Sequence, residues 1–203
     1  MRRRSSAVLL VAFAACLTAV SCAPKTMKVD ATTQATAQYP SGDRGKLPPP
    51  SDDYRVLGVK QGIKGWVVQY DDKVFRGGEF FSDSAAKALR GWDVKTVVSV
   101  TPNDKEREFC RKHGLDLVEV PFDKTRGPSS EDLRCFLEAV REKEGPVYVH
   151  CVGGTHRGGL LGFAYRLHVL NWTEDRALVE YGRLGGDLKD DHNMLEAVLS
   201  FKP

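Results

Sequence analysis

Short runs rich in β-branched residues alternate with helix-compatible segments through most of this chain, and that alternation limits the folds it can adopt. The strand-like runs are 95–100, 115–120 and 147–149. The helix-compatible segments are 82–90, 104–113, one that begins at Ser129 or Ser130 and ends at Gly145-Pro146, and 160–170. This pattern predicts an α/β fold with a central, mostly parallel, twisted sheet of about four to five strands flanked by helices. Ligands are then expected at the carboxyl ends of the strands.

The first part of the folded region has a different pattern. Residues 66–70 and 73–76 are two short runs rich in aromatic and β-branched side chains, and Asp71-Asp72 lies between them. Two short strand-like runs joined by a tight turn predict an antiparallel hairpin, which we expect at the edge of the sheet. Two further helices are expected at the other end of the chain, from Thr173 to about Leu184 and over 193–201.

Length and charge narrow the class of protein. The chain has 203 residues with 41% hydrophobic content, which is enough for one ordinary core, so we expect one folded domain. The 30 basic and 27 acidic residues are interspersed and leave a formal charge of only +3. No basic face of the kind that binds nucleic acid is indicated.

The N-terminus has the layout of a secretory signal. Arg2, Arg3 and Arg4 precede an uncharged stretch over 7–20, which is too short for a comfortable membrane span. We interpret residues 1–22 as a signal peptide and expect the protein to be exported.

The signal ends in Ala19-Val20-Ser21-Cys22, which resembles a bacterial lipobox. The interpretation is that Cys22 is lipidated and anchors the protein to a membrane, at the periplasmic or extracytoplasmic face. Cleavage without a lipid and an uncleaved anchor are the alternatives. Residues 23–53 are rich in Thr, Ala, Gln, Gly and Pro, a composition that buries little apolar surface, so we expect a disordered tether before a domain over 54–203.

A glycine-rich loop joins the strand at 147–149 to the helix that begins near Arg157. Such a loop, entering a helix N-terminus, can point several backbone N–H groups at one anion. Gly153 and Gly154 permit the backbone angles that this needs. We therefore expect a phosphate-binding cradle formed by Val152, Gly153, Gly154, Thr155, His156 and Arg157.

Two residues in this loop carry the expected chemistry. The backbone N–H groups and the helix dipole favour a thiolate at Cys151, which makes it the candidate nucleophile. Arg157 follows after five intervening residues, and its planar fork can hold two phosphate oxygens as lysine cannot. His150 is expected to orient the loop by hydrogen bonds.

The segment HCVGGTHRG resembles the His-Cys-x5-Arg signature of the protein tyrosine and dual-specificity phosphatase superfamily. The resemblance covers about 54–184, and Val74-Phe75-Arg76-Gly77-Gly78 resembles a Tyr-Arg-Ser-Gly-type segment of the compact bacterial and plant-fungal members. It implies the cysteine-phosphatase fold and a reaction through a cysteinyl-phosphate intermediate, with no cofactor and no metal. The implied partner is a phosphorylated protein or a small phosphomonoester.

The same resemblance implies a general acid, an aspartate on a loop about thirty residues before the cysteine. Asp123 follows a strand and lies 28 positions before Cys151, so it is the candidate, with Glu131 and Asp132 as alternatives. Gly158 departs from the family, which commonly has Ser or Thr after the arginine to assist departure of the thiolate. Thr155 could substitute for that hydroxyl.

The sequence therefore predicts a cysteine-dependent phosphatase. Because the loop side chains from Val152 to Thr155 are neutral, we expect phosphotyrosine-type substrates, while Lys124 and Arg126 keep a more anionic substrate such as an inositol phosphate open. A phosphate-recognition module without turnover and a rhodanese-like sulfurtransferase are two competing interpretations. Cys110 and Cys135 are expected to be buried helix residues, with a disulfide between them as the alternative.

Overall fold

The computed structural model describes residues 46–203. The predicted signal peptide over 1–22, the lipidation of Cys22 and most of the predicted tether over 23–53 lie outside the described residues. Within 46–203, no helix is long and apolar enough to cross a membrane.

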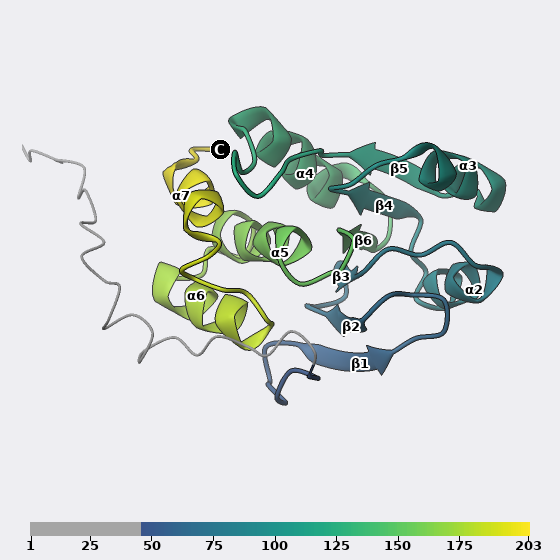
Figure 1. Cartoon of the computed structure of the whole chain (residues 1–203), viewed down its shortest axis with the longest axis horizontal. Helices are drawn as coiled ribbons and strands as arrows, with labels where there is room; N and C mark the ends of the chain where they lie inside the picture. Colours follow the sequence, from purple (N-terminus) through teal and green to yellow (C-terminus); the bar gives the residue numbers. More distant parts are fainter. Residues whose placement is uncertain (1–45) are drawn as a thin grey trace, which may run out of the picture. The chain divides into compact units, whose positions relative to one another are not determined.

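The described chain forms one mixed sheet with the strand order β1-β2-β3-β6-β4-β5 (Figure 1). The strands β1, β2 and β3 are antiparallel neighbours, whereas β3, β6, β4 and β5 run parallel. This confirms the predicted α/β fold with a mostly parallel sheet. The strands are β1 (Arg55–Val59), β2 (Trp66–Gln69), β3 (Val74–Gly77), β4 (Thr96–Ser99), β5 (Asp116–Glu119) and β6 (Val147–His150).

The sheet has six strands, one more than the sequence predicts. The predicted hairpin is β2 and β3, but it does not form the edge, because β1 pairs outside β2 and β3 pairs with β6. The segment that forms β1 is half-exposed, and the register shifts between Val56 and Gly58, where the glycine has a φ of 74°. A short, irregular and partly exposed strand lacks the alternation of apolar and polar residues that identifies strands from sequence.

The helices match the predicted segments to within a few residues because short-range capping signals mark their ends. Ser82, Asn103 and Ser129 each accept a backbone N–H at a helix N-terminus, and Gly114 ends α3 in the left-handed region with a φ of 66°. The helices are α2 (Asp83–Gly91), α3 (Asp104–His113), α4 (Ser130–Glu142), α5 (Arg157–His168), α6 (Glu174–Arg183) and α7 (His192–Ser200).

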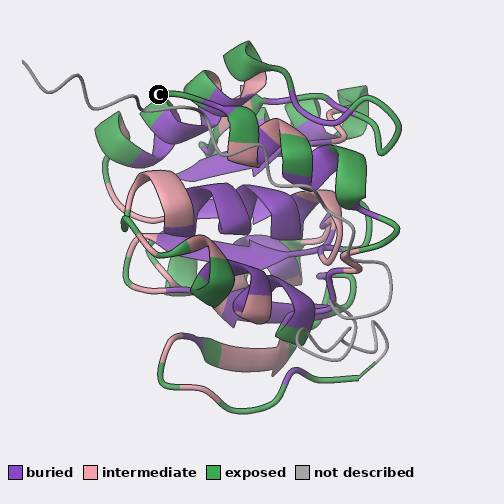
Figure 2. Ribbon diagram, turned by 90° about the vertical axis from the view of Figure 1, so that its left-hand side faces the viewer, coloured by how far each residue is buried: buried purple, intermediate pink, exposed green. Residues whose placement is uncertain are grey.

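Side chains on the two faces of the sheet enter two different apolar clusters. On one face Val68, Val98 and Val149 pack with α4, α5, α6 and α7, and on the other Val67, Val97 and Tyr148 pack with α2 and α3. The strand period of two explains this division, since successive side chains point to opposite faces. Buried residues run through the middle of the ribbon and include most of α5 (Figure 2).

This architecture places the glycine-rich loop at the centre of the sheet. Strand β6 lies between β3 and β4, all three run parallel, and the loop over 151–156 leaves the carboxyl end of β6 and enters α5. In an open α/β sheet the crevice at the carboxyl ends of such strands is where ligands bind.

Candidate functional site

The loop closes around the sulfur of Cys151. Only 3% of this residue is exposed, and the Gly154 N–H donates a hydrogen bond to Sγ over 3.3 Å. Gly154 has a φ of 81°, and a Cβ there would lie 2.4 Å from the carbonyl carbon of Gly77. Two features therefore require a glycine here, namely the left-handed backbone angle and the close contact with the end of β3.

The segment after β3 holds the loop from outside. The Glu79 N–H donates to the carbonyl oxygen of Val152 over 3.3 Å, and the Gly78 N–H donates to that of Lys64 over 3.2 Å. A Cβ on Gly78 would lie 2.3 Å from the Lys64 oxygen. The paired glycines of the Val74–Gly78 motif thus let three backbone segments approach one another under the loop.

Arg157 is the first residue of α5 and bridges two loops. Its Nη1 donates to the carbonyl oxygen of Phe122 over 3.2 Å. Phe122 is buried and immediately precedes Asp123, so the candidate phosphate-binding guanidinium and the candidate acid lie on adjoining segments. Sequence separation alone could not show this contact, which spans 35 positions.

Asp123 is exposed, and its carboxylate closes a local turn. Oδ1 accepts hydrogen bonds from the backbone N–H groups of Arg126 and Thr125, each over 2.8 Å. These two bonds lower the pKa of Asp123 below its usual 3.8, and the bond from Arg126 has the larger effect. The positive charges of Arg126 and Arg157 lower this pKa further. The turn therefore engages Oδ1 of the carboxylate.

The two alternative acids serve the start of α4. Asp132 completes a capping box, accepting the Ser129 N–H over 2.8 Å and the Ser129 hydroxyl over 2.6 Å. Glu131 is paired with Arg134 over 3.2 Å on the exposed side of the helix. Their contacts are those of first-turn helix carboxylates, so Asp123 remains the candidate.

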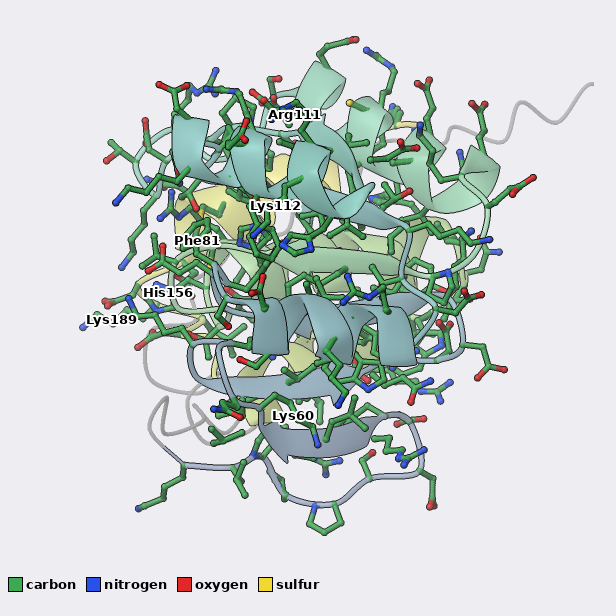
Figure 3. The ribbon with its side chains drawn as sticks, turned by 90° about the vertical axis from the view of Figure 1, so that its right-hand side faces the viewer. Lys60, Phe81, Arg111, Lys112, His156 and Lys189 are labelled. Atoms are coloured by element: carbon green, nitrogen blue, oxygen red, sulfur yellow. The ribbon has the colours of Figure 1, made fainter. Side chains whose placement is uncertain are left out.

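The rim of the site carries both apolar and basic groups. Val152 and Phe81 are exposed large apolar side chains, at 37% and 41%. Figure 3 shows Phe81, His156 and Lys189 at the same margin of the molecule. Thr155 faces the segment after α6, where a Cβ on Gly185 would lie 3.4 Å from its Cγ2.

His150 is buried and has two polar contacts. Its Nε2 lies 2.5 Å from Oε1 of Glu106 on α3, and its Nδ1 lies 3.4 Å from the carbonyl oxygen of Cys151. The sequence predicts that His150 orients the loop but gives no sign of Glu106, which looks like one more charge in a polar helix. No local pattern distinguishes it from its neighbours.

The other cysteines in the described region are free thiols. Cys110 is buried on α3 and Cys135 is half-buried on α4, so the disulfide alternative is not realised. Burial raises the pKa of Cys110 to about 12 and also raises that of Cys135, which leaves both protonated near neutral pH. Among residues 46–203 there is no group of three or more His, Cys, Asp or Glu side chains that could hold a metal ion.

Comparison with known proteins gives a family match over most of the domain. Residues 56–192 match the family described as DSP-PTPase phosphatase fused to NAD+ kinase. The dual specificity protein phosphatase TpbA of Pseudomonas aeruginosa strain UCBPP-PA14 is 35% identical over 104 residues, which are 51% of this chain and 47% of TpbA. The inositol diphosphatase DSP4 of Arabidopsis thaliana is 26% identical over 152 residues, covering 64% of this chain and 75% of DSP4. The sequence match to TpbA thus spans about half the length of that protein.

Solved structures show the same fold. The crystal structure of a P. aeruginosa TpbA Cys-to-Ser variant in complex with pTyr has a TM-score of 0.60 at 25% identity, over 76% of this chain and 93% of that one. The core catalytic domain of the PP-IP phosphatase SIW14 from S. cerevisiae, in complex with citrate, has a TM-score of 0.53 at 18% identity, over 77% of this chain and 89% of that one. The second likeness concerns the fold alone.

Proposed function

We propose that this chain, which belongs to the DSP-PTPase phosphatase family, hydrolyses phosphomonoesters with Cys151 as its nucleophile. The observation that carries the proposal is the Gly154 N–H directed at Sγ, in a loop that β6, β3 and α5 hold together. Backbone N–H groups preset around one sulfur stabilise a thiolate and then the oxygens of a bound phosphate.

The reaction takes place in two steps. The Cys151 thiolate attacks phosphorus, an S–P bond forms, and the P–O ester bond breaks while its oxygen takes a proton from Asp123. A water molecule then attacks phosphorus and gives its proton to the Asp123 carboxylate, while the S–P bond breaks and returns the thiolate. In both steps the Arg157 fork and the loop N–H groups bind the phosphoryl oxygens.

A phosphotyrosine-type substrate is supported by the charges around the loop. Lys124 lies 3.4 Å from Asp190 and 3.9 Å from Asp191, and Arg126 lies 3.6 Å from Asp132. Their positive charges are thus partly compensated, which disfavours a second phosphate group beside the site. The TpbA variant crystallised with pTyr supports the same choice, whereas the name of the DSP4 relative supports the inositol phosphate alternative.

Asp123→Ala tests the general acid, and a comparison of substrates tests the substrate class. We expect kcat on a phosphotyrosine peptide to fall by about 10²-fold, the lower range for loss of a general acid. On 4-nitrophenyl phosphate the loss should be several times smaller, since that leaving group departs without a proton. Asp132→Ala is the matched control and should keep the wild-type ratio between the two substrates. Equal losses of kcat on both substrates would show that Asp123 is not the general acid. If the wild-type chain hydrolyses an inositol phosphate faster than the phosphotyrosine peptide, the proposed substrate class is wrong.

Gly158→Ser tests the second step. A Cβ at Gly158 would meet the backbone N of Cys151 at 3.5 Å, an ordinary contact, so a serine fits where the family commonly has a hydroxyl. One added hydrogen bond to the departing thiolate is worth about 1 kcal/mol, and we expect phosphoenzyme hydrolysis to become roughly fivefold faster in single-turnover measurements.

The matched control is the neighbouring glycine. A Cβ at Gly159 would lie 2.6 Å from Nη1 of the buried Arg76, so Gly159→Ser should lower the free energy of unfolding by about 1–3 kcal/mol. An unchanged or slower second step in Gly158→Ser, with the fold intact, would show that this position does not limit departure of the thiolate.

A further inference from the structure

Glu106 is a fully buried carboxylate that the proposed reaction does not use. None of the residue is exposed, and it lies in the first turn of α3, where its backbone N–H donates to the side chain of the N-cap Asn103 over 3.1 Å. A buried carboxylate is costly unless it is paired and hydrogen-bonded. Its partners therefore show what the fold uses it for.

Both oxygens of Glu106 have partners on the central strands. Oε2 accepts from the Ser99 hydroxyl over 2.7 Å, and Oε1 lies 2.5 Å from Nε2 of His150. Ser99 on β4 and His150 on β6 are direct register partners, and both are buried. The carboxylate thus joins the ends of two parallel strands at the point where the Cys151 loop leaves the sheet.

The protons on His150 follow from these contacts. Nδ1 faces the carbonyl oxygen of Cys151, which can only accept, so Nδ1 carries a hydrogen. Nε2 and the Glu106 oxygen are joined by a short hydrogen bond. Phe80 packs edge-on against the ring at 5.1 Å and Tyr148 stacks on it at 5.9 Å, which fixes its plane.

We propose that Glu106 is a positioning residue for the nucleophile loop. By binding Nε2, it directs the Nδ1–H of His150 at the Cys151 carbonyl and fixes the first peptide of the loop that surrounds the thiolate. This role rests on the proposed function, because it matters only if Cys151 reacts as a thiolate.

The other titratable groups around this pair keep their charge near neutral pH. Burial raises the pKa of Tyr148 well above 10 and that of Cys110, on α3, to about 12, so both are neutral near neutral pH. Arg76 on β3 acts on Tyr148 as a fixed positive charge.

Glu106→Gln in the full chain tests the proposal. An amide is similar in shape to the carboxylate but forms weaker, uncharged hydrogen bonds. His150 and the first peptide of the loop are then held less firmly, and the loop stabilises the thiolate less well. We expect kcat on 4-nitrophenyl phosphate to fall by about tenfold to 10²-fold, as for a displaced catalytic group, with KM little changed. The acidic limb of the kcat/KM profile should move to higher pH.

Glu108→Gln is the matched control on the same helix. Glu108 is exposed, and its Oε1 lies 2.7 Å from Nη2 of Arg111. Figure 3 labels Arg111, which lies on α3. Its loss should leave kcat and the pH profile unchanged. Wild-type kinetics and an unmoved acidic limb in Glu106→Gln would overturn the proposal. A fall in kcat that is fully explained by a smaller fraction of folded protein would also overturn it.

A second measurement does not depend on turnover. We expect iodoacetate to alkylate Cys151 about tenfold more slowly at neutral pH in Glu106→Gln than in Glu108→Gln, because less thiolate is present. Peptide mass analysis separates Cys151 from the other cysteines. If Glu106→Gln does not fold, Glu106→Asp, which keeps the charge on a shorter stem, replaces it, and alkylation at the wild-type rate would then overturn the proposal. A wild-type chain without phosphatase activity, but with the expected alkylation difference, would reject the proposed function and retain the role of Glu106.

Discussion

Replacing Cys151 with serine should lower kcat on 4-nitrophenyl phosphate by at least ~10⁴-fold, because the covalent route loses its nucleophile. A serine hydroxyl stays protonated near neutral pH, and the loop N–H groups and helix dipole that favour a thiolate cannot ionise it. The fold should tolerate the change, because serine is slightly smaller than cysteine and can accept the Gly154 N–H that now points at Sγ. Steady-state turnover with excess EDTA, together with thermal unfolding, checks both expectations.

Cys135→Ser is the control for the thiol itself. Cys135 is a half-buried free cysteine on α4, and its replacement should leave turnover within about twofold, as for a conservative change away from the reacting atoms. Turnover that survives in Cys151→Ser would exclude the covalent mechanism. A wild-type chain that binds phosphopeptide without hydrolysing it would instead identify a recognition module.

Replacing Arg157 with lysine should lower kcat by about 10²- to 10³-fold, the usual loss for one preset donor group at a developing negative charge. Lysine keeps the charge but loses the planar fork that holds two phosphate oxygens. It also loses the bond from Nη1 to the Phe122 carbonyl, which joins the phosphate loop to the segment before Asp123. We therefore expect KM to rise as well, because the lysine variant binds the ground-state phosphate less well.

Arg126→Lys separates the fork from general positive charge. Arg126 lies on the Asp123 segment, is exposed, and has its guanidinium near Asp132 and the Pro121 carbonyl. The lysine variant there should stay within a few-fold of wild type, because its charge is screened by solvent. Equal kinetic losses in the two lysine variants would show that Arg157 acts only as a charge and would contradict its bidentate role.

Short-range features of the sequence predicted most of the elements. Helix α3 begins and ends where expected, since Asn103 caps its start and Gly114 takes the left-handed angle at its end. The loop from Cys151 to Arg157 could be located for the same reason, because its strand, glycines and helix are contiguous along the chain.

Long-range contacts could not be predicted in this way. Strand β1 was missed and the hairpin was placed at the edge, because which strand covers which depends on pairing between distant segments. The turn around Asp123 was also unforeseen. Its two N–H donors are close in sequence, but nothing in the pattern showed that the carboxylate would use them rather than face the loop.

The sequence by itself determined the order of elements and the spacing of His150, Cys151 and Arg157, because strand, turn and capping signals act between residues a few positions apart. Only the tertiary structure decided that Glu106, 44 positions before His150, lies against its ring, and that Arg157 reaches the Phe122 carbonyl. The physical reason is that burial and the order of parallel strands bring these groups together, and a charged residue in a polar helix gives no local sign of the partner it will meet.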